Sequence, residues 1–361
     1  MKSDVDKSIT IFHVGGVGEY GPIEAILSSQ FAKYITLVLF EARGENEEDL
    51  IVHEEHSLRG IKTFIVPYCI SDKAGRVNFY VNEESVSSSI FKPNVEASKM
   101  HLESYPDHIR TWGDNTQLDQ EISLEAITLD DAIVKYNFPN PDIISIDAQG
   151  AELKILKSCL SSLQCSTTCV VTEIEFAEIY QGQSLFCDQV SLLHNYDFSL
   201  MDIVNTQYWH PEMTFGKGFL TVGEAIFLKK HNRLSSFLNN EGFPKLIKLA
   251  CISLCFHRYS MTYYIISILI DSDLKNKTLS FISENKDFKV LEDIFLFINK
   301  NRNEYYEKNK YIFSEYSVTS DFKIHKNKNI YVYVKRRDRV KRKFNTIIDK
   351  LFNIFTILRL R

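Results

Sequence analysis

The chain has 361 residues and a mass of 41.9 kDa, and 44% of its residues are apolar. This indicates a globular protein with one large core or two smaller ones. The net charge of -5 hides an asymmetry, because residues 1–231 carry 17 basic and 34 acidic residues, whereas residues 232–361 carry 25 and 13. Since charge determines what a surface attracts, we expect two units, 1–231 and 232–361, with different partners.

The cysteines and apolar stretches argue against a disulfide-bonded, zinc-binding, secreted or membrane-spanning protein. The seven cysteines include no Cys-x-x-Cys pair and no histidine at zinc-site spacing, which predicts reduced thiols. The charged N-terminal residues and the short apolar run after them do not resemble a secretion signal. The most apolar later stretch, 249–270, contains His257 and Arg258 and is too short to span a bilayer. We therefore expect a cytoplasmic protein and a core helix over 249–270.

Strands and helices alternate along the first part of the chain, which predicts a parallel α/β sheet. Apolar runs predict strands over 9–14, 34–40, 63–70, 142–146 and 169–175. Pro22 suits the first turn of a helix, and Thr128 is a plausible N-cap for another. A further strand is expected over 75–81, followed by an excursion over 85–120 that is long enough to be a lid or substrate loop.

The last two predicted strands, 198–203 and 224–229, are joined by a loop rather than a helix. They are therefore expected to run antiparallel to each other. This ending differs from a plain dinucleotide-binding fold and suits the sheet of class I methyltransferases, in which the last two strands form a hairpin.

A glycine loop follows the first strand, and its run Gly16-Val17-Gly18-Glu19-Tyr20-Gly21 fits G-x-G-x-x-G. Glu41 ends the second strand about 20 residues on, where an acid binds both hydroxyls of a ribose. NAD and S-adenosylmethionine both need these features, so the pattern alone leaves both cofactors open.

The run Pro141-Asp142-Ile143-Ile144-Ser145-Ile146-Asp147-Ala148-Gln149-Gly150-Ala151-Glu152 contains a strand, a tight turn and a helix start. Open α/β sheets bind ligands at the carboxyl ends of their strands, which is where Asp147 is expected. Glu152 falls in the first helical turn, where an acid stabilises the helix end or the turn backbone.

These motifs occur in the order and spacing of the FkbM-like family of methyltransferases, which residues 9–230 resemble. The resemblance depends on the glycine loop, Phe40-Glu41, Ile70-Ser71-Asp72, Ser87-Ser88-Ser89, Thr128-Leu129-Asp130-Asp131, the run ending in Glu152, and Glu173-Ile174-Glu175-Phe176 through Tyr180. It implies a Rossmann-like, seven-stranded, mostly parallel sheet with an antiparallel final hairpin. It also implies S-adenosylmethionine as methyl donor and a hydroxyl acceptor on a sugar, glycan or secondary metabolite.

The expected cofactor site departs from the family at the first strand. His13 stands where members usually have Asp, and Gly16-Val17 replaces the usual alanine-asparagine pair. The expected cofactor-binding residues are His13, Gly15, Gly16, Gly18, Glu41, Ser71, Asp72 and Asp147.

Methyl transfer to a hydroxyl requires the protein to align the acceptor and remove its proton. We expect Asp147 to be the base or the acceptor-positioning group, with Glu173 at the next strand end as its partner and Tyr180 orienting the substrate. A Mg²⁺ ion between the two acids is the alternative, but it is not favoured because no third acidic ligand stands out. His101, Tyr105, His108 and Trp112 in the excursion are interpreted as scattered surface residues rather than acceptor contacts.

The chain ends in a basic cluster, 335–343, joined to apolar residues at helical spacing up to 358. Such a segment fits an anionic membrane surface, on its inner face for a cytoplasmic protein. Nucleic acid as a partner is not favoured. The alternative to membrane binding is a terminal helix that packs on its own domain. An NAD-dependent oxidoreductase and a non-catalytic scaffold remain the alternative functions, and the sequence does not determine the oligomeric state.

Overall fold

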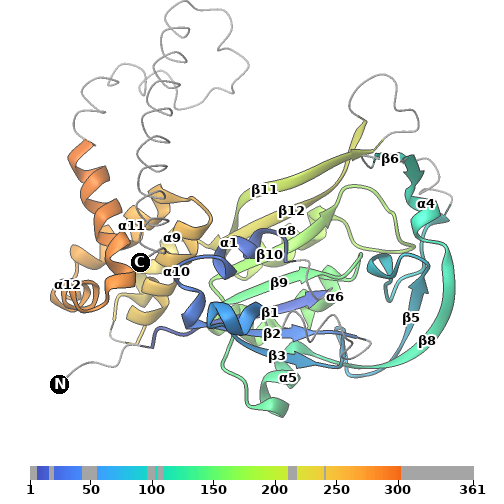
Figure 1. Ribbon diagram of the computed structural model, residues 1–361, viewed down its shortest axis with the longest axis horizontal. Coiled ribbons are helices and arrows are strands. Elements are labelled where there is room, and N and C mark those ends of the chain that lie inside the picture. Colours follow the sequence, from blue (N-terminus) through green and yellow to red (C-terminus); the bar gives the residue numbers. More distant parts are fainter. Residues whose placement is uncertain are drawn as a thin grey trace, which may run out of the picture. The chain divides into compact units, whose positions relative to one another are not determined.

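The computed structural model describes residues 6–15, 20–42, 55–95, 102–104, 109–209, 218–239 and 241–301. The chain divides into two compact units, 1–297 and 298–361. The centre of the first unit is a seven-stranded sheet with the order β11-β12-β10-β9-β1-β2-β3 (Figure 1). The strands are β1 (Ile9–Gly15), β2 (Ile35–Phe40), β3 (Lys62–Val66), β9 (Ile143–Asp147), β10 (Cys169–Glu175), β11 (Phe198–Trp209) and β12 (Phe219–Lys229).

Strands β3, β2, β1, β9 and β10 run parallel to one another, while β12 is antiparallel to both β10 and β11. This is the arrangement of a class I methyltransferase sheet, so the predicted fold class is confirmed. All the parallel strands end at one edge of the sheet, here called the carboxyl edge, and begin at the opposite amino edge.

Helices cover both faces of the sheet because alternate residues of each strand point to opposite sides. Ile11 of β1 and Leu39 of β2 face one core, whereas Phe12 and Phe40 face the other. The second core is completed by α5 (Leu129–Tyr136), α6 (Glu152–Lys157), α7 (Leu160–Cys165) and α8 (Phe186–Asn195). Thr128 caps α5 as predicted, since its hydroxyl accepts from the Asp131 N–H at 3.0 Å.

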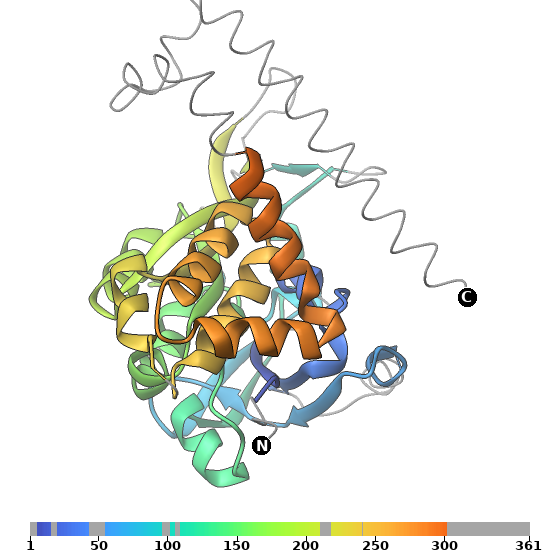
Figure 2. The same ribbon diagram turned by 90° about the vertical axis from the view of Figure 1, so that its left-hand side faces the viewer.

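The first core is completed by α1 (Glu24–Leu27) and by the helices that follow the sheet. These are α9 (His231–Leu234), α10 (Phe243–Cys255), α11 (Tyr259–Ile270) and α12 (Lys275–Glu284), which lie together beside the sheet (Figure 2). The apolar stretch 249–270 is buried and helical as expected, but it forms parts of two helices, because the chain turns at His257 with a φ of 59°.

The compact unit therefore extends beyond residue 231, since α10–α12 share a core with the sheet. The division into a methyltransferase domain over 1–231 and a basic C-terminal region over 232–361 stays a prediction about function. No helix among the described residues is long and apolar enough to cross a membrane. All seven cysteines are free thiols.

A second sheet lies beyond the carboxyl edge and has the order β4-β8-β5. Its strands are β4 (Cys69–Ile70), β5 (Gly75–Asn82) and β8 (Leu118–Ile127). The third strand predicted over 63–70 was therefore too long. It divides after Val66, where Pro67 has no N–H to donate to the β2 ladder, and residues 69–70 pair with β8 instead.

The excursion predicted over 85–120 is only partly irregular. It contains the 3₁₀ turn η3 (Ser85–Ser87), a small hairpin of β6 (Leu102–Ser104) and β7 (Ile109–Thr111), and α4 (Trp112–Asn115). Its last residues belong to β8, which pairs antiparallel with β5.

Candidate active site

The carboxyl edge brings the ends of β1, β9 and β10 together. Gly15 at the end of β1 is the register partner of Asp147 at the end of β9. Gly15 has a φ of 142°, and a Cβ at this position would lie 2.1 Å from the Asp147 carbonyl oxygen. Only glycine allows this approach, so the first glycine of the loop places the β1 end directly against the expected base.

The turn after Asp147 is held by side chains from two other segments. Gln149 has a φ of 54°, which is costly for a residue with a side chain. The Ser89 hydroxyl donates to the Gln149 carbonyl oxygen at 2.7 Å. The Ala148 and Gly150 N–H groups donate to Glu152 Oε1 at 2.9 and 3.2 Å. The predicted role of Glu152 in the turn backbone is thereby confirmed.

The Gln149 side chain joins the predicted catalytic residues. Its Nε2 donates to Asp147 Oδ1 at 3.0 Å and to Glu173 Oε2 at 3.2 Å. Its Oε1 lies 3.0 Å from the Tyr180 hydroxyl. One amide therefore fixes the positions of Asp147, Glu173 and Tyr180 relative to one another.

Tyr180 is fully buried, and its hydroxyl donates to the Ser87 carbonyl oxygen at 2.7 Å. Trp112 packs edge-on against the Tyr180 ring and lies 5.1 Å from the Trp209 ring. These contacts hold the Tyr180 side chain in place within the site. Its role in orienting the substrate stays a prediction. Trp112 belongs to this aromatic cluster, while His101, Tyr105 and His108 lie outside the residues whose side chains are described.

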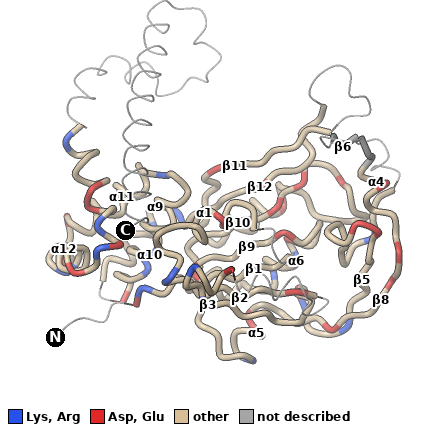
Figure 3. Tube along the Cα trace, viewed as in Figure 1, with Lys and Arg blue, Asp and Glu red and all other residues tan. Residues whose placement is uncertain are grey.

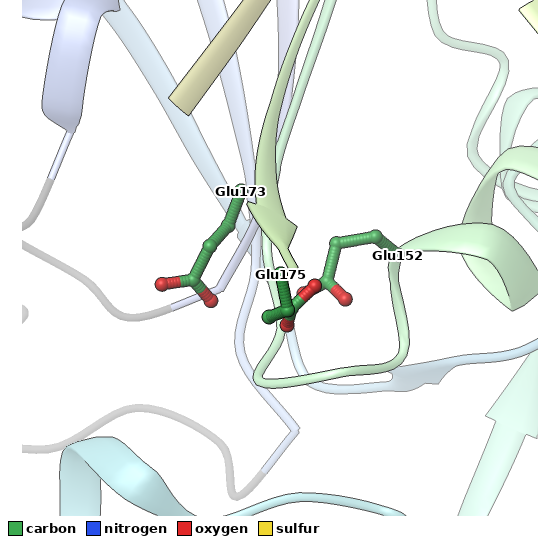
Figure 4. A group of neighbouring side chains, drawn as sticks. All are labelled: Glu152, Glu173 and Glu175. Atoms are coloured by element: carbon green, nitrogen blue, oxygen red, sulfur yellow. The ribbon is translucent and has the colours of Figure 1, made fainter. Parts of the chain in front are cut away.

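Asp and Glu occupy several positions at and beyond the carboxyl edge, among others elsewhere along the trace (Figure 3). Glu152, Glu173 and Glu175 each offer an oxygen within 4.8 Å of the others (Figure 4). Burial raises the pKa of Glu152 to about 7, and burial together with the charge of Asp147 raises the pKa of Glu173 well above its usual value. Burial and the charge of Glu152 raise the pKa of Glu175 in the same direction.

No basic residue in the described part of the chain forms an ion pair with Asp147, Glu152, Glu173 or Glu175. Glu224, which is the register partner of Glu173, accepts from Asn205 and is also unpaired with a base among the described residues. The described part of the edge thus presents acids and no basic side chain paired with them, a composition that suits a cationic ligand better than an anionic one.

The predicted cofactor residues occupy several strand ends. His13 is buried within β1, where its Nδ1 lies 3.0 Å from Ser145 Oγ and its ring contacts Tyr20. Glu41 directly follows β2, and its N–H donates to the Val66 carbonyl at 3.1 Å. Gly16 and Gly18 lie outside the described residues.

Ser71 and Asp72 follow β4, and the Ser71 hydroxyl donates to Asp72 Oδ1 at 3.2 Å. Lys154 of α6 lies 3.4 Å from the same oxygen. Partial burial opposes ionisation of Asp72, but Lys154 and Ser71 prevail and lower its pKa. Asp72 is thereby tied to the helix that follows Asp147, and its contact with a cofactor stays a prediction.

Two residues of this site were not predicted from the sequence. Gln149 was expected only as part of the turn, and its role depends on a left-handed conformation that no sequence pattern indicates. Glu175 was not among the expected site residues, although the Glu-x-Glu spacing places it on the same side of an extended strand as Glu173. That spacing was the available signal.

Residues 32–200 match the family model described as the methyltransferase FkbM domain. A curated protein of Sinorhizobium fredii named 2-O-methyltransferase NoeI is 31% identical over 121 residues, which are 32% of this chain and 44% of that protein. The match therefore spans less than half of that relative.

Two solved structures are similar at low scores. Methyltransferase FkbM from Methylobacillus flagellatus is 11% identical with a TM-score of 0.33, covering 62% of this chain and 44% of that one. Precorrin-6y C5,15-methyltransferase from Geobacter metallireducens is 11% identical with a TM-score of 0.29, covering 62% and 80%.

Proposed function

We propose that this protein transfers a methyl group from S-adenosylmethionine to a hydroxyl of a sugar or glycan, starting from the match of residues 32–200 to the methyltransferase FkbM domain. The observation that carries the proposal is the contact of Gly15 with Asp147 at the carboxyl edge of a class I sheet. Ligands of open α/β sheets bind outside the carboxyl ends of the strands.

The acidic side chains of the site suit S-adenosylmethionine better than NAD. S-adenosylmethionine carries a sulfonium and an ammonium group, whereas NAD carries an anionic pyrophosphate. The carboxyl edge presents Asp147, Glu173 and Glu224 with no ion pair to a basic residue in the described part of the chain, so it offers an anion no cationic partner there. Gly15, Glu41, Asp72 and Asp147 are the described residues that would hold the cofactor, which supplies an activated methyl group when bound.

Asp147 is the proposed base for the acceptor hydroxyl. Burial and neighbouring acids raise the pKa of Glu173, so Glu173 retains its proton more readily. Gln149 donates to both carboxyl groups and holds Asp147 in one orientation. A fixed carboxylate that accepts a proton in the transition state accelerates such a reaction by about 100-fold to 10,000-fold.

The name of the 2-O-methyltransferase relative supports a hydroxyl oxygen as the acceptor atom. The proposed sugar or glycan rests on the family resemblance of residues 9–230. The basic segment 335–361, which lies outside the described residues, is proposed to bring the protein to an anionic membrane surface carrying lipid-linked glycan. Deletion of 335–361 is then expected to shift the full chain from the membrane fraction to the soluble fraction.

Methyl transfer is tested with S-adenosylmethionine labelled on the methyl carbon and a panel of free and lipid-linked sugars. We expect label to enter at least one acceptor and Asp147→Asn to lower the rate of transfer by about 1,000-fold. Absence of labelled product, together with reduction of NAD in the presence of a sugar, would instead support the oxidoreductase alternative.

A further inference from the structure

Three glutamates from two elements converge next to the proposed base. Glu152 begins α6, and Glu173 and Glu175 end β10. Figure 4 shows the Glu152 and Glu175 carboxyl groups directed toward each other, with Glu173 beside them. One oxygen from each residue lies within 4.8 Å of the other two.

The cluster contains buried oxygen atoms that have no partner. Glu175 is fully buried, and neither of its carboxyl oxygens has a well-formed hydrogen bond in the described part of the chain, although the nearby N–H groups of Gly150 and Glu175 partly oppose the rise of its pKa that burial causes. Glu152 is also fully buried, and its Oε2 has no hydrogen-bond partner among the described residues. A buried carboxylate without a partner is strongly unfavourable, so three oxygens facing one another need a positive charge or protons between them.

The surrounding groups orient the carboxylates without occupying these free oxygens. The turn backbone donates only to Glu152 Oε1, which leaves Oε2 facing the cluster. Gln149 Nε2 donates to Glu173 Oε2 and leaves the other oxygen available. Carboxylates that bind metals are typically held by hydrogen bonds of this kind.

We propose that Glu152, Glu173 and Glu175 bind a hard divalent cation. Oxygen ligands select Ca²⁺, Mg²⁺ or Mn²⁺ over softer metals. Oxygen ligands lie about 2.0–2.6 Å from such an ion, so one ion can bridge three carboxyl oxygens that lie within 4.8 Å of one another. A bound cation would lie close to the proposed base, because Gln149 connects Glu173 to Asp147. This site goes beyond the proposed methyl transfer and does not depend on it.

The test is calorimetric titration of the full chain, first treated with chelator, with Ca²⁺, Mg²⁺ and Mn²⁺ near neutral pH. We expect one site per chain that binds at least one of the three cations. Glu175→Gln keeps the shape of the side chain and removes its charge, so it should weaken binding by at least about tenfold. Glu224→Gln removes a charge from the same edge outside the cluster and should weaken it by less than about threefold.

Thermal unfolding supplies a second readout that needs no methyl donor. The cation should raise the unfolding temperature of the wild type and of Glu224→Gln but not that of Glu175→Gln. Equal weakening by both variants would mean diffuse attraction and would overturn the proposal. So would the absence of binding by all three cations at about 10 mM, beyond the weakest protein calcium sites, because the three carboxyl groups then hold protons.

Discussion

The two edges of the main sheet differ in whether their buried charged side chains have partners within the protein. At the amino edge, Asp142 Oδ2 accepts from the Thr10 N–H at 2.9 Å and from Lys248 Nζ of α10 at 3.2 Å. Lys229 donates to the Leu163 and Tyr196 carbonyls at 2.6 and 2.9 Å. Each of these buried charges at the amino edge has partners within the protein.

At the carboxyl edge, the side-chain oxygens of Glu175 and one oxygen of Glu152 have no partner among the described residues, and Asp147 accepts from the Gln149 amide and not from a basic side chain in that part of the chain. The difference separates charge that supports the fold from charge that is available to a ligand. Substitutions at the amino edge should therefore change stability, whereas substitutions at the carboxyl edge should change binding and catalysis.

The largest expected effect is on catalysis. Asp147→Asn should lower kcat by about 1,000-fold, because the amide cannot accept the acceptor proton, while the unfolding midpoint in urea stays near that of the wild type. Asp142→Asn, five residues earlier in the same segment, is the matched control and should destabilise the protein but leave kcat nearly unchanged. Equal loss of activity in the two variants would remove the distinction between the edges.

Breaking the buried ion pair at the amino edge should have the next largest effect. Lys248→Met leaves Asp142 buried without its cation and should lower the free energy of unfolding by about 3 kcal/mol. Lys245→Met on the same helix removes an exposed hydrogen bond to the Cys165 carbonyl and a contact with the Phe237 ring, but leaves no buried charge unpaired, and it serves as control. Urea unfolding measures both, and the comparison fails if the two variants lose similar stability.

Alanine substitutions at Gly15 and Gly75 distinguish the cost of a positive φ from the cost of a clash between the added Cβ and a neighbouring segment. Their φ angles are 142° and 137°, but an added Cβ meets the Asp147 backbone only at Gly15 and meets nothing within 4 Å at Gly75. Gly15→Ala should therefore lose about 2 kcal/mol more stability than Gly75→Ala. It should also weaken binding of S-adenosylhomocysteine, which calorimetry detects. A loss of equal size in both variants would mean that φ alone is responsible.

The smallest expected effect concerns the partly exposed Asp72–Lys154 ion pair. The folded-state pKa of Asp72 is lowered, so its stabilisation is present above the ordinary pKa and is lost as pH falls through the lowered one. Lys154→Met should raise the pKa of Asp72, measured by NMR titration, and lower stability at neutral pH by less than about 1 kcal/mol. Lys157→Met on the same helix should change neither quantity.

Much of the fold was predictable because local patterns agree with it. The strand over 169–175 was predicted with its observed bounds, since its apolar run is buried on both sides of the sheet. By contrast, β8 was missed because most of its side chains are exposed, and it forms through pairing with β5 about 40 residues earlier. Such pairing leaves only a weak local signal.

The sequence predicted where the site residues lie in the sheet, but not the hydrogen bonds that link them. Asp147 and Glu173 follow from the rule that strand ends carry the chemistry. The bridge between them depends on the Gln149 backbone conformation and on Ser89 from a distant segment. Neither the unpartnered oxygens of Glu175 nor their closeness to Glu152 can be read from spacing along the chain.

The most direct test of the central claim is calorimetric titration of the full chain with S-adenosylhomocysteine and, separately, with NAD. The acidic carboxyl edge predicts binding of S-adenosylhomocysteine and no binding of NAD. Glu41→Ala should weaken the binding by at least about tenfold, because it removes a charged partner of the ribose hydroxyls. Binding of NAD without binding of S-adenosylhomocysteine would contradict the assignment of this edge as a methyl-donor site.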